Sequence, residues 1–82
     1  MTSYIALLRK SRASDYSVEF PDLPGCVTAG RTLDEARQLA REALALHLKG
    51  MAEDGEVVPA PYSLDDVMAD PDNDGAVAFL VE

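Results

Sequence analysis

The sequence predicts a single small α+β domain with the element order β-β-β-α-β. In this arrangement three strands pair antiparallel, a fourth strand lies parallel to the first, and one long helix packs on the sheet. The observations behind it are short apolar or alternating stretches in the first 30 residues, a long stretch rich in Ala and Leu, and a final apolar run. A chain of 82 residues accommodates one domain of this size.

Three short strands are expected in the first 30 residues. The first is nearly all apolar, and the second, YSVEF, alternates between apolar and polar side chains as a strand with one buried face does. Polar residues 9–14 form the first turn, Pro21 ends the second strand, and the Pro24-Gly25 turn leads into the third. Because the strands are short and the connections tight, they pair antiparallel. The expected strands are residues 4–8, 16–20 and 26–29.

One long helix is expected from Thr32 to about Glu53. The segment TLDE has the form of a capping box, in which Thr32 caps the helix and Glu35 reaches back to the cap. Apolar residues then recur at spacings of three and four, which predicts one helix face that lies on the sheet. That face comprises Ala36, Leu39, Ala40, Ala43, Leu44, His47 and Met51.

The last third of the chain predicts a short helix capped by Ser63 and a strand over residues 76–81. Six consecutive apolar residues are typical of a strand buried on both faces. Since a long helix separates this strand from the third one, a right-handed crossover would make it a parallel neighbour inside the sheet. The equally apolar first strand is the expected partner.

The charge is uneven along the chain. Residues 1–49 carry seven Lys or Arg and six Asp or Glu, whereas residues 50–82 carry nine acids and no Lys or Arg. Direct binding to nucleic acid is therefore not expected, because phosphate binding depends on cations that displace counterions. A basic protein partner is favoured, since complementary charge speeds and orients the encounter. The simpler alternative is that the acids only keep a small domain soluble.

The chain is expected to be cytoplasmic and to make no contact with a membrane. Its N-terminus has no basic leader and only five consecutive apolar residues, too few for a secretion signal or a membrane span. A single cysteine, Cys26, forms no internal disulfide. The exposed edges of so small a sheet also favour a homodimer or a higher homo-oligomer.

Several motifs together resemble the HicB-like antitoxin family. They are the alternating strand, FPDLPGC, GRTLDEA, a helix that continues REAL, and EDGEVVPAP, and the resemblance runs from Tyr4 to Val81. It implies a domain similar to a reduced ribonuclease H fold, in agreement with the element order above. It also implies that the protein neutralises HicA, a small basic toxin that cuts messenger RNA, by covering the RNA-binding and catalytic surface of the toxin. Many family members carry an additional DNA-binding domain. This chain stops at Glu82, so residues 1–82 are expected to form one antitoxin domain without it.

No enzymatic activity, cofactor or metal site is expected. A ribonuclease H type nuclease holds two metal ions with carboxylates from the sheet and the helix, yet residues 4–8 and 76–81 carry no acid. Cys26 and His47 are the residue types of a thiol nucleophile and its base, but both lie in apolar patterns that favour packing. The segment DPDNDG resembles the start of a calcium loop, but its twelfth position is Val81, so a turn is favoured.

The partner-binding surface is expected at the FPDLPGC loop and neighbouring acids. The prolines and glycine make a rigid reversal, and Leu23 between them is either tucked over the core or presented to a partner. A preorganised loop loses little entropy on docking. The expected contact residues are Asp22, Leu23, Pro24, Glu53 and Asp54. The alternative function is a stand-alone homo-oligomeric regulatory or scaffold domain without a toxin partner.

Overall fold

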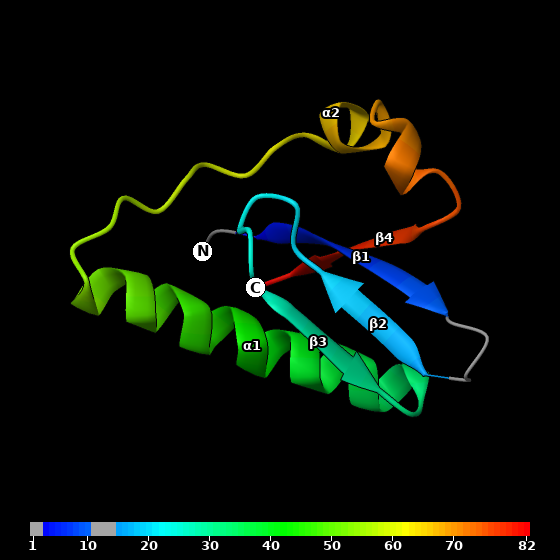
Figure 1. Ribbon diagram of the computed structural model, residues 1–82, viewed down its shortest axis with the longest axis horizontal. Helices are drawn as coiled ribbons and strands as arrows, with labels where there is room; N and C mark the ends of the chain where they lie inside the picture. The colour runs from blue at the N-terminus through cyan, green and yellow to red at the C-terminus, as the bar shows by residue number, and fades with distance from the viewer. Residues whose placement is uncertain (1–2, 11–14) are drawn as a thin grey trace.

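A four-stranded antiparallel sheet carries one long helix on one face and two short helical elements on the other (Figure 1). The structure is a computed structural model that describes residues 3–10 and 15–82. The turn expected over residues 9–14 falls partly on residues 11–14, which lie outside the described residues. The elements are β1 (Tyr4–Lys10), β2 (Tyr16–Glu19), β3 (Val27–Gly30), α1 (Leu33–Glu53), α2 (Leu64–Met68), the 3₁₀ helix η1 (Pro71–Asn73) and β4 (Val77–Val81).

The strand order is β3-β2-β1-β4, and every neighbouring pair is antiparallel. The predicted antiparallel pairing of the first three strands is confirmed, as is the partnership of β4 with β1. The predicted parallel direction of β4 is wrong, since Tyr4 pairs with Val81 and Leu8 with Val77. The reason is the path of the chain between β3 and β4. Helix α1 runs along the sheet in one direction, and residues 54–63, which we call the strap, return in the other direction to α2 (Figure 1). Strand β4 therefore starts beside the end of β1 and runs antiparallel to it.

The main core lies between the sheet and α1. The expected apolar face of the helix is confirmed, with Ala36, Ala40 and Leu44 fully buried. Small alanines let the helix approach the strands closely, and burial of the apolar side chains stabilises the fold by about 25 cal/mol per Å². The strand residues in this core are Tyr4, Ala6, Leu8, Val18 and Val81, and Phe20, directly after β2, packs with them.

The start of α1 follows the expected capping pattern with one difference. The Glu35 backbone N–H donates to Thr32 Oγ1 at 3.1 Å, as an N-cap requires. The Glu35 carboxylate accepts from the backbone N–H of Arg31 at 3.2 Å, one residue before the cap. The short helix α2 is also confirmed, because the Asp66 N–H donates to Ser63 Oγ at 3.1 Å.

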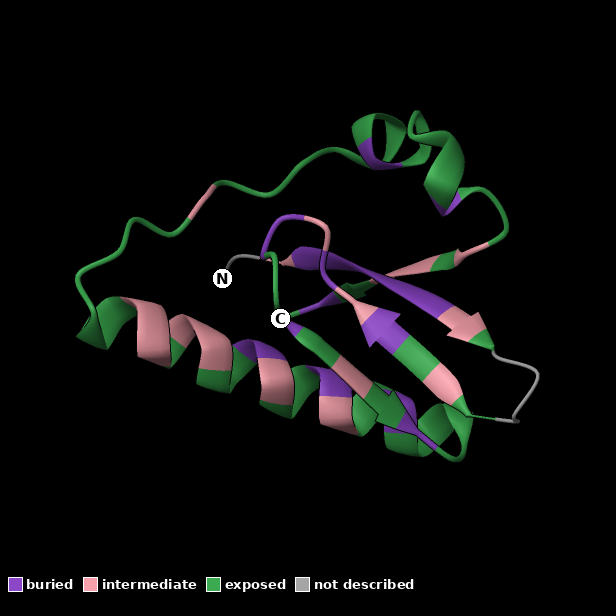
Figure 2. Ribbon diagram, viewed as in Figure 1, coloured by how far each residue is buried: buried purple, intermediate pink, exposed green. Residues whose placement is uncertain are grey.

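The second face of the sheet is only partly covered. Ile5 and Leu7 of β1 pack under Val67 of α2, which forms a small second core. The predicted burial of β4 on both faces is wrong: Val77 and Leu80 are 60% and 69% exposed. As the last strand of the sheet, β4 has a neighbour on one side, and α2 with η1 covers part of its outer face (Figure 2).

The described part of the chain contains no helix that is both long enough and apolar enough to cross a membrane.

Candidate protein-binding surface

The FPDLPGC loop is a closed turn whose apolar residue faces inward. Leu23 is 1% exposed and belongs to the main core, so of the two alternatives for this side chain the tucked position is observed. The Leu23 N–H donates to the Phe20 carbonyl at 3.0 Å, and the Cys26 N–H donates to the Leu23 carbonyl at 3.0 Å. Gly25 has a φ of 89°, which L side chains rarely adopt, so the glycine is needed for this reversal. Pro24 stays exposed at the tip.

Asp22 is buried and fastens the strap to this loop. Its Oδ1 accepts a hydrogen bond from the Tyr62 backbone N–H at 3.0 Å. Its Oδ2 is buried and has no hydrogen-bond partner among the described residues. A second hydrogen bond ties the strap down, from the Tyr4 hydroxyl to the Pro59 carbonyl at 2.9 Å. In this conformation the Asp22 carboxylate holds the strap in place and is not exposed at the surface.

Glu53 and Asp54 are exposed but lie away from the loop. Cys26, the last residue of the loop, contacts Ala43 of α1, and Glu53 is ten residues further along the helix, about 15 Å away at 1.5 Å per residue. The structure therefore does not bring the five expected contact residues into one patch, and their contact with a partner stays a prediction.

Cys26 is a packing residue. Its side chain is buried, its Sγ–H donates to the Ala43 carbonyl at 3.7 Å, and burial raises the pKa of the Cys26 thiol above its ordinary value of 9.0. A thiol held neutral is a poor nucleophile. His47 lies beside it on a shallow hollow with Leu46. Within residues 3–10 and 15–82, no three His, Cys, Asp or Glu side chains are placed to hold a metal ion.

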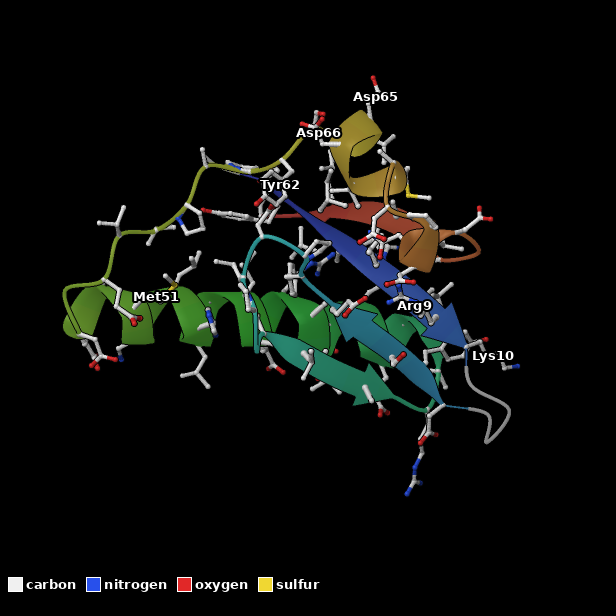
Figure 3. The ribbon with its side chains drawn as sticks, turned by 45° about the horizontal axis from the view of Figure 1, so that its top comes forward. Arg9, Lys10, Met51, Tyr62, Asp65 and Asp66 are labelled. Carbon is white, nitrogen blue, oxygen red and sulfur yellow. The ribbon has the colours of Figure 1, made fainter. Side chains whose placement is uncertain are left out.

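The DPDNDG segment forms the expected turn into β4. Asp70 caps η1 by accepting from the Asp72 N–H at 3.0 Å. Arg9 reaches across from β1 and donates to the Asn73 side chain at 3.1 Å and to the Asp72 carbonyl at 3.2 Å. Arg9 also forms an ion pair with Glu19. This arginine, labelled in Figure 3, is therefore occupied by contacts within the chain.

An apolar groove opens where the strap, α2 and the β1–β4 pair meet. Its volume is about 280 Å³, and Tyr62, Leu64 and Leu80, which line it, are each more than half exposed. This surface was not expected, because residues 76–81 were predicted to lie inside the sheet, whereas β4 is an edge strand. The lining of this α2–β4 groove is Ser3, Ile5, Tyr62, Leu64, Ala78, Phe79 and Leu80.

The nine acids of residues 50–82 are all exposed. Asp65 and Asp66 follow Leu64 in the first turn of α2 and lie on the same side of the molecule as Tyr62 (Figure 3). Glu82 follows β4 at the other end of the groove, where its carboxylate accepts from the Ser3 hydroxyl at 3.5 Å. The described surface thus combines an exposed apolar groove with an acidic rim, a combination that suits protein binding.

Known proteins are similar to this chain in both sequence and fold. The family described as the HicB_like antitoxin of bacterial toxin-antitoxin systems matches residues 4–82. A 14.9 kDa protein from the rep-hol intergenic region of Haemophilus phage HP1 is 37% identical over 67 residues, which cover 82% of this chain and 50% of that protein. The chain thus spans half the length of this relative.

Two solved antitoxins have closely similar structures. The Burkholderia pseudomallei antitoxin HicB has 34% sequence identity and a TM-score of 0.88, over 100% of this chain and 63% of that one. The antitoxin HicB3 has 27% identity and a TM-score of 0.80, over 99% of this chain and 61% of that one. A HicA3 and HicB3 toxin-antitoxin complex gives the same identity and TM-score, but there 96% of the matched chain is covered. With a family match over nearly its whole length and a fold shared with solved HicB proteins, the chain belongs to the HicB-like antitoxin family.

Proposed function

We propose that this protein is the antitoxin of a type II toxin–antitoxin system. It neutralises a small basic HicA-like mRNA interferase by binding it directly and covering its RNA-binding and catalytic surface. The observation that supports this most is the solved complex of HicA3 with HicB3. The HicB3 chain in that complex is spanned almost completely by this chain, whereas HicB3 alone is longer. The part of HicB3 present with its toxin thus corresponds to the domain described above.

The charge distribution supports the same role. A toxin that cuts messenger RNA has to attract phosphates, so its working surface is cationic. This protein has a net charge of −8, and its last third presents nine exposed acids without any Lys or Arg. An acidic surface is drawn to the same cations as the RNA and excludes it once docked.

The protein acts in this proposal by binding alone. It needs no cofactor, does not bind nucleic acid directly and works in the cytoplasm, where messenger RNA is translated. Buried Cys26 and the structural role of Asp22 support a non-catalytic chain. We expect the antitoxin to form a homodimer or a higher homo-oligomer, because β3 and β4 are both edges of a small sheet.

Coexpression with the toxin tests the proposed function. The toxin is a small basic HicA-like protein, sought first among the genes next to the one that encodes this chain, and the measurement is growth of the host cells. Growth should stop when the toxin is expressed alone and resume when this protein is coexpressed, and the two proteins should copurify. The complex should weaken at high salt, since exposed charges are screened. Continued growth arrest while both proteins accumulate would reject the antitoxin role.

A further inference from the structure

The α2–β4 groove is built before any partner arrives. Its floor is Ile5 and Ala78, which belong to the small second core under Val67. The Tyr62 wall is held through its backbone N–H by Asp22 at 3.0 Å. The α2 wall is held by the Asn73 side chain, which donates to the Val67 carbonyl at 2.8 Å. A surface fixed in this way loses little conformational entropy when it binds.

The exposed part of the groove is unusually apolar for a surface. Leu80 is 69% exposed, and Tyr62 and Leu64 flank it from two other parts of the chain. Contiguous exposed apolar groups that are rimmed by polar residues mark interaction sites in soluble proteins. Tyrosine is also enriched among the residues that dominate binding energy at interfaces.

The charge around the groove decides whether a second copy of this chain or a basic protein suits it better. A symmetric dimer through this groove would place the same patch of both copies together, so Asp65 and Asp66 would face a second set of acids. Like charges brought together disfavour that contact, and residues 50–82 supply no Lys or Arg to compensate. A partner with cations around an apolar side chain matches the groove in both respects.

We propose that the α2–β4 groove is the docking site for a basic protein partner, which places an apolar side chain against Tyr62, Leu64 and Leu80 and cations beside Asp65 and Asp66. This inference rests on the proposed function, since that partner is the HicA-like toxin. It assigns the contact to a surface that differs from the FPDLPGC loop and the end of α1.

The test measures the affinity of the toxin for groove variants. The toxin is used in a catalytically inactivated form, and the dissociation constant is obtained by titration calorimetry. Leu80→Ser and Tyr62→Ala should each weaken binding tenfold or more, as expected for central apolar contacts. Leu46→Ser is the matched control: Leu46 is similarly exposed, but it lies on α1 outside the groove, so its variant should bind within about twofold of the wild type.

A second pair of variants tests the acidic rim. The double variant Asp65→Asn and Asp66→Asn should weaken binding at low salt and have a smaller effect at high salt, where exposed charges are screened. Glu42→Gln, an exposed acid in the middle of α1, is the control and should leave the affinity unchanged at both salt concentrations. Circular dichroism checks that each variant is folded.

The outcomes separate the groove from the proposed function. If the wild-type protein and both groove variants bind the toxin equally well, the groove is not the docking site, and the antitoxin role is unaffected. A wild-type protein that does not bind the toxin would overturn both. Light scattering covers the second copy: if Leu80→Ser turns a dimer into a monomer at unchanged toxin affinity, the groove belongs to the homodimer and the proposal is wrong.

Discussion

Replacing Gly30 by alanine tests the closest approach between the sheet and α1. Gly30 is the last residue of β3 and is buried against the first turn of the helix. A Cβ added at this position would lie 2.6 Å from the backbone N of Ala36 and 2.9 Å from its Cα. Both atoms belong to the backbone, so no side-chain rotation relieves the overlap.

The cost of this change follows from the overlap. To restore an ordinary contact, the separation has to grow from 2.6 to 3.4 Å, so the start of α1 moves by about 0.8 Å. Overpacking of this kind costs about 1–3 kcal/mol. The shift also strains the bond from Glu35 to the Thr32 cap, which contributes about 1 kcal/mol. The lower entropy of the unfolded alanine chain offsets about 0.4–1 kcal/mol. We expect a net destabilisation of about 2 kcal/mol, which lowers Tm by roughly 10 °C in a domain of this size.

Gly50→Ala is the matched control. Gly50 lies inside α1, and a Cβ there meets no described atom within 4 Å. This variant should stabilise the protein by about 0.5–1 kcal/mol, the difference in helix propensity between the two residues. Urea unfolding followed by helical circular dichroism measures both. If Gly30→Ala proves as stable as Gly50→Ala, the close contact between β3 and α1 is not present.

Three further predictions test the core and the strap. Burial raises the pKa of the Cys26 thiol above its ordinary pKa of 9.0. The stability that the neutral thiol contributes is therefore complete below pH 9.0 and is lost as the pH rises through the higher pKa of the folded state. The urea midpoint should fall at alkaline pH in the wild type and fall less in Cys26→Ala. Asp22→Ala should release the strap at a cost of about 1–3 kcal/mol for the lost hydrogen bond, although it also removes the unpartnered Oδ2. Hydrogen exchange at the Tyr62 amide, measured by NMR, should become faster. Unchanged exchange would mean that Asp22 does not hold the strap. Leu44→Ala should cost about 2–5 kcal/mol in thermal unfolding and Leu46→Ala less than about 0.5 kcal/mol, and equal losses would contradict the assigned helix face.

The local elements of this fold are readable in the sequence because their signals are local. Alternation in YSVEF and the Thr32 cap act over a few residues, and the structure places β2 and α1 where these patterns predict. The direction of β4 is different, since it depends on the path of the strap. A single helical crossover gives a parallel strand, whereas a helix followed by an extended return gives an antiparallel one. Nothing in the apolar run of residues 76–81 distinguishes the two paths.

The candidate surface was harder to predict for the same reason. An apolar run is expected to be buried, so Leu80 has no signal that marks it as exposed until the position of β4 at the edge is known. Asp22 illustrates the opposite error. A carboxylate in a proline-rich loop suggests an exposed contact, but its hydrogen bond to residue 62, forty positions away, holds it inside. Contacts between distant segments decide both cases.

The ribonuclease activity of the HicA-like toxin, titrated with this protein, gives the sharpest test of the proposed antitoxin role. Cleavage of a messenger RNA should fall with each addition and stop near equimolar protein, and the Leu80→Ser variant should need a clear excess to reach the same inhibition. Undiminished cleavage at about a tenfold molar excess of the folded wild-type protein would reject the antitoxin role.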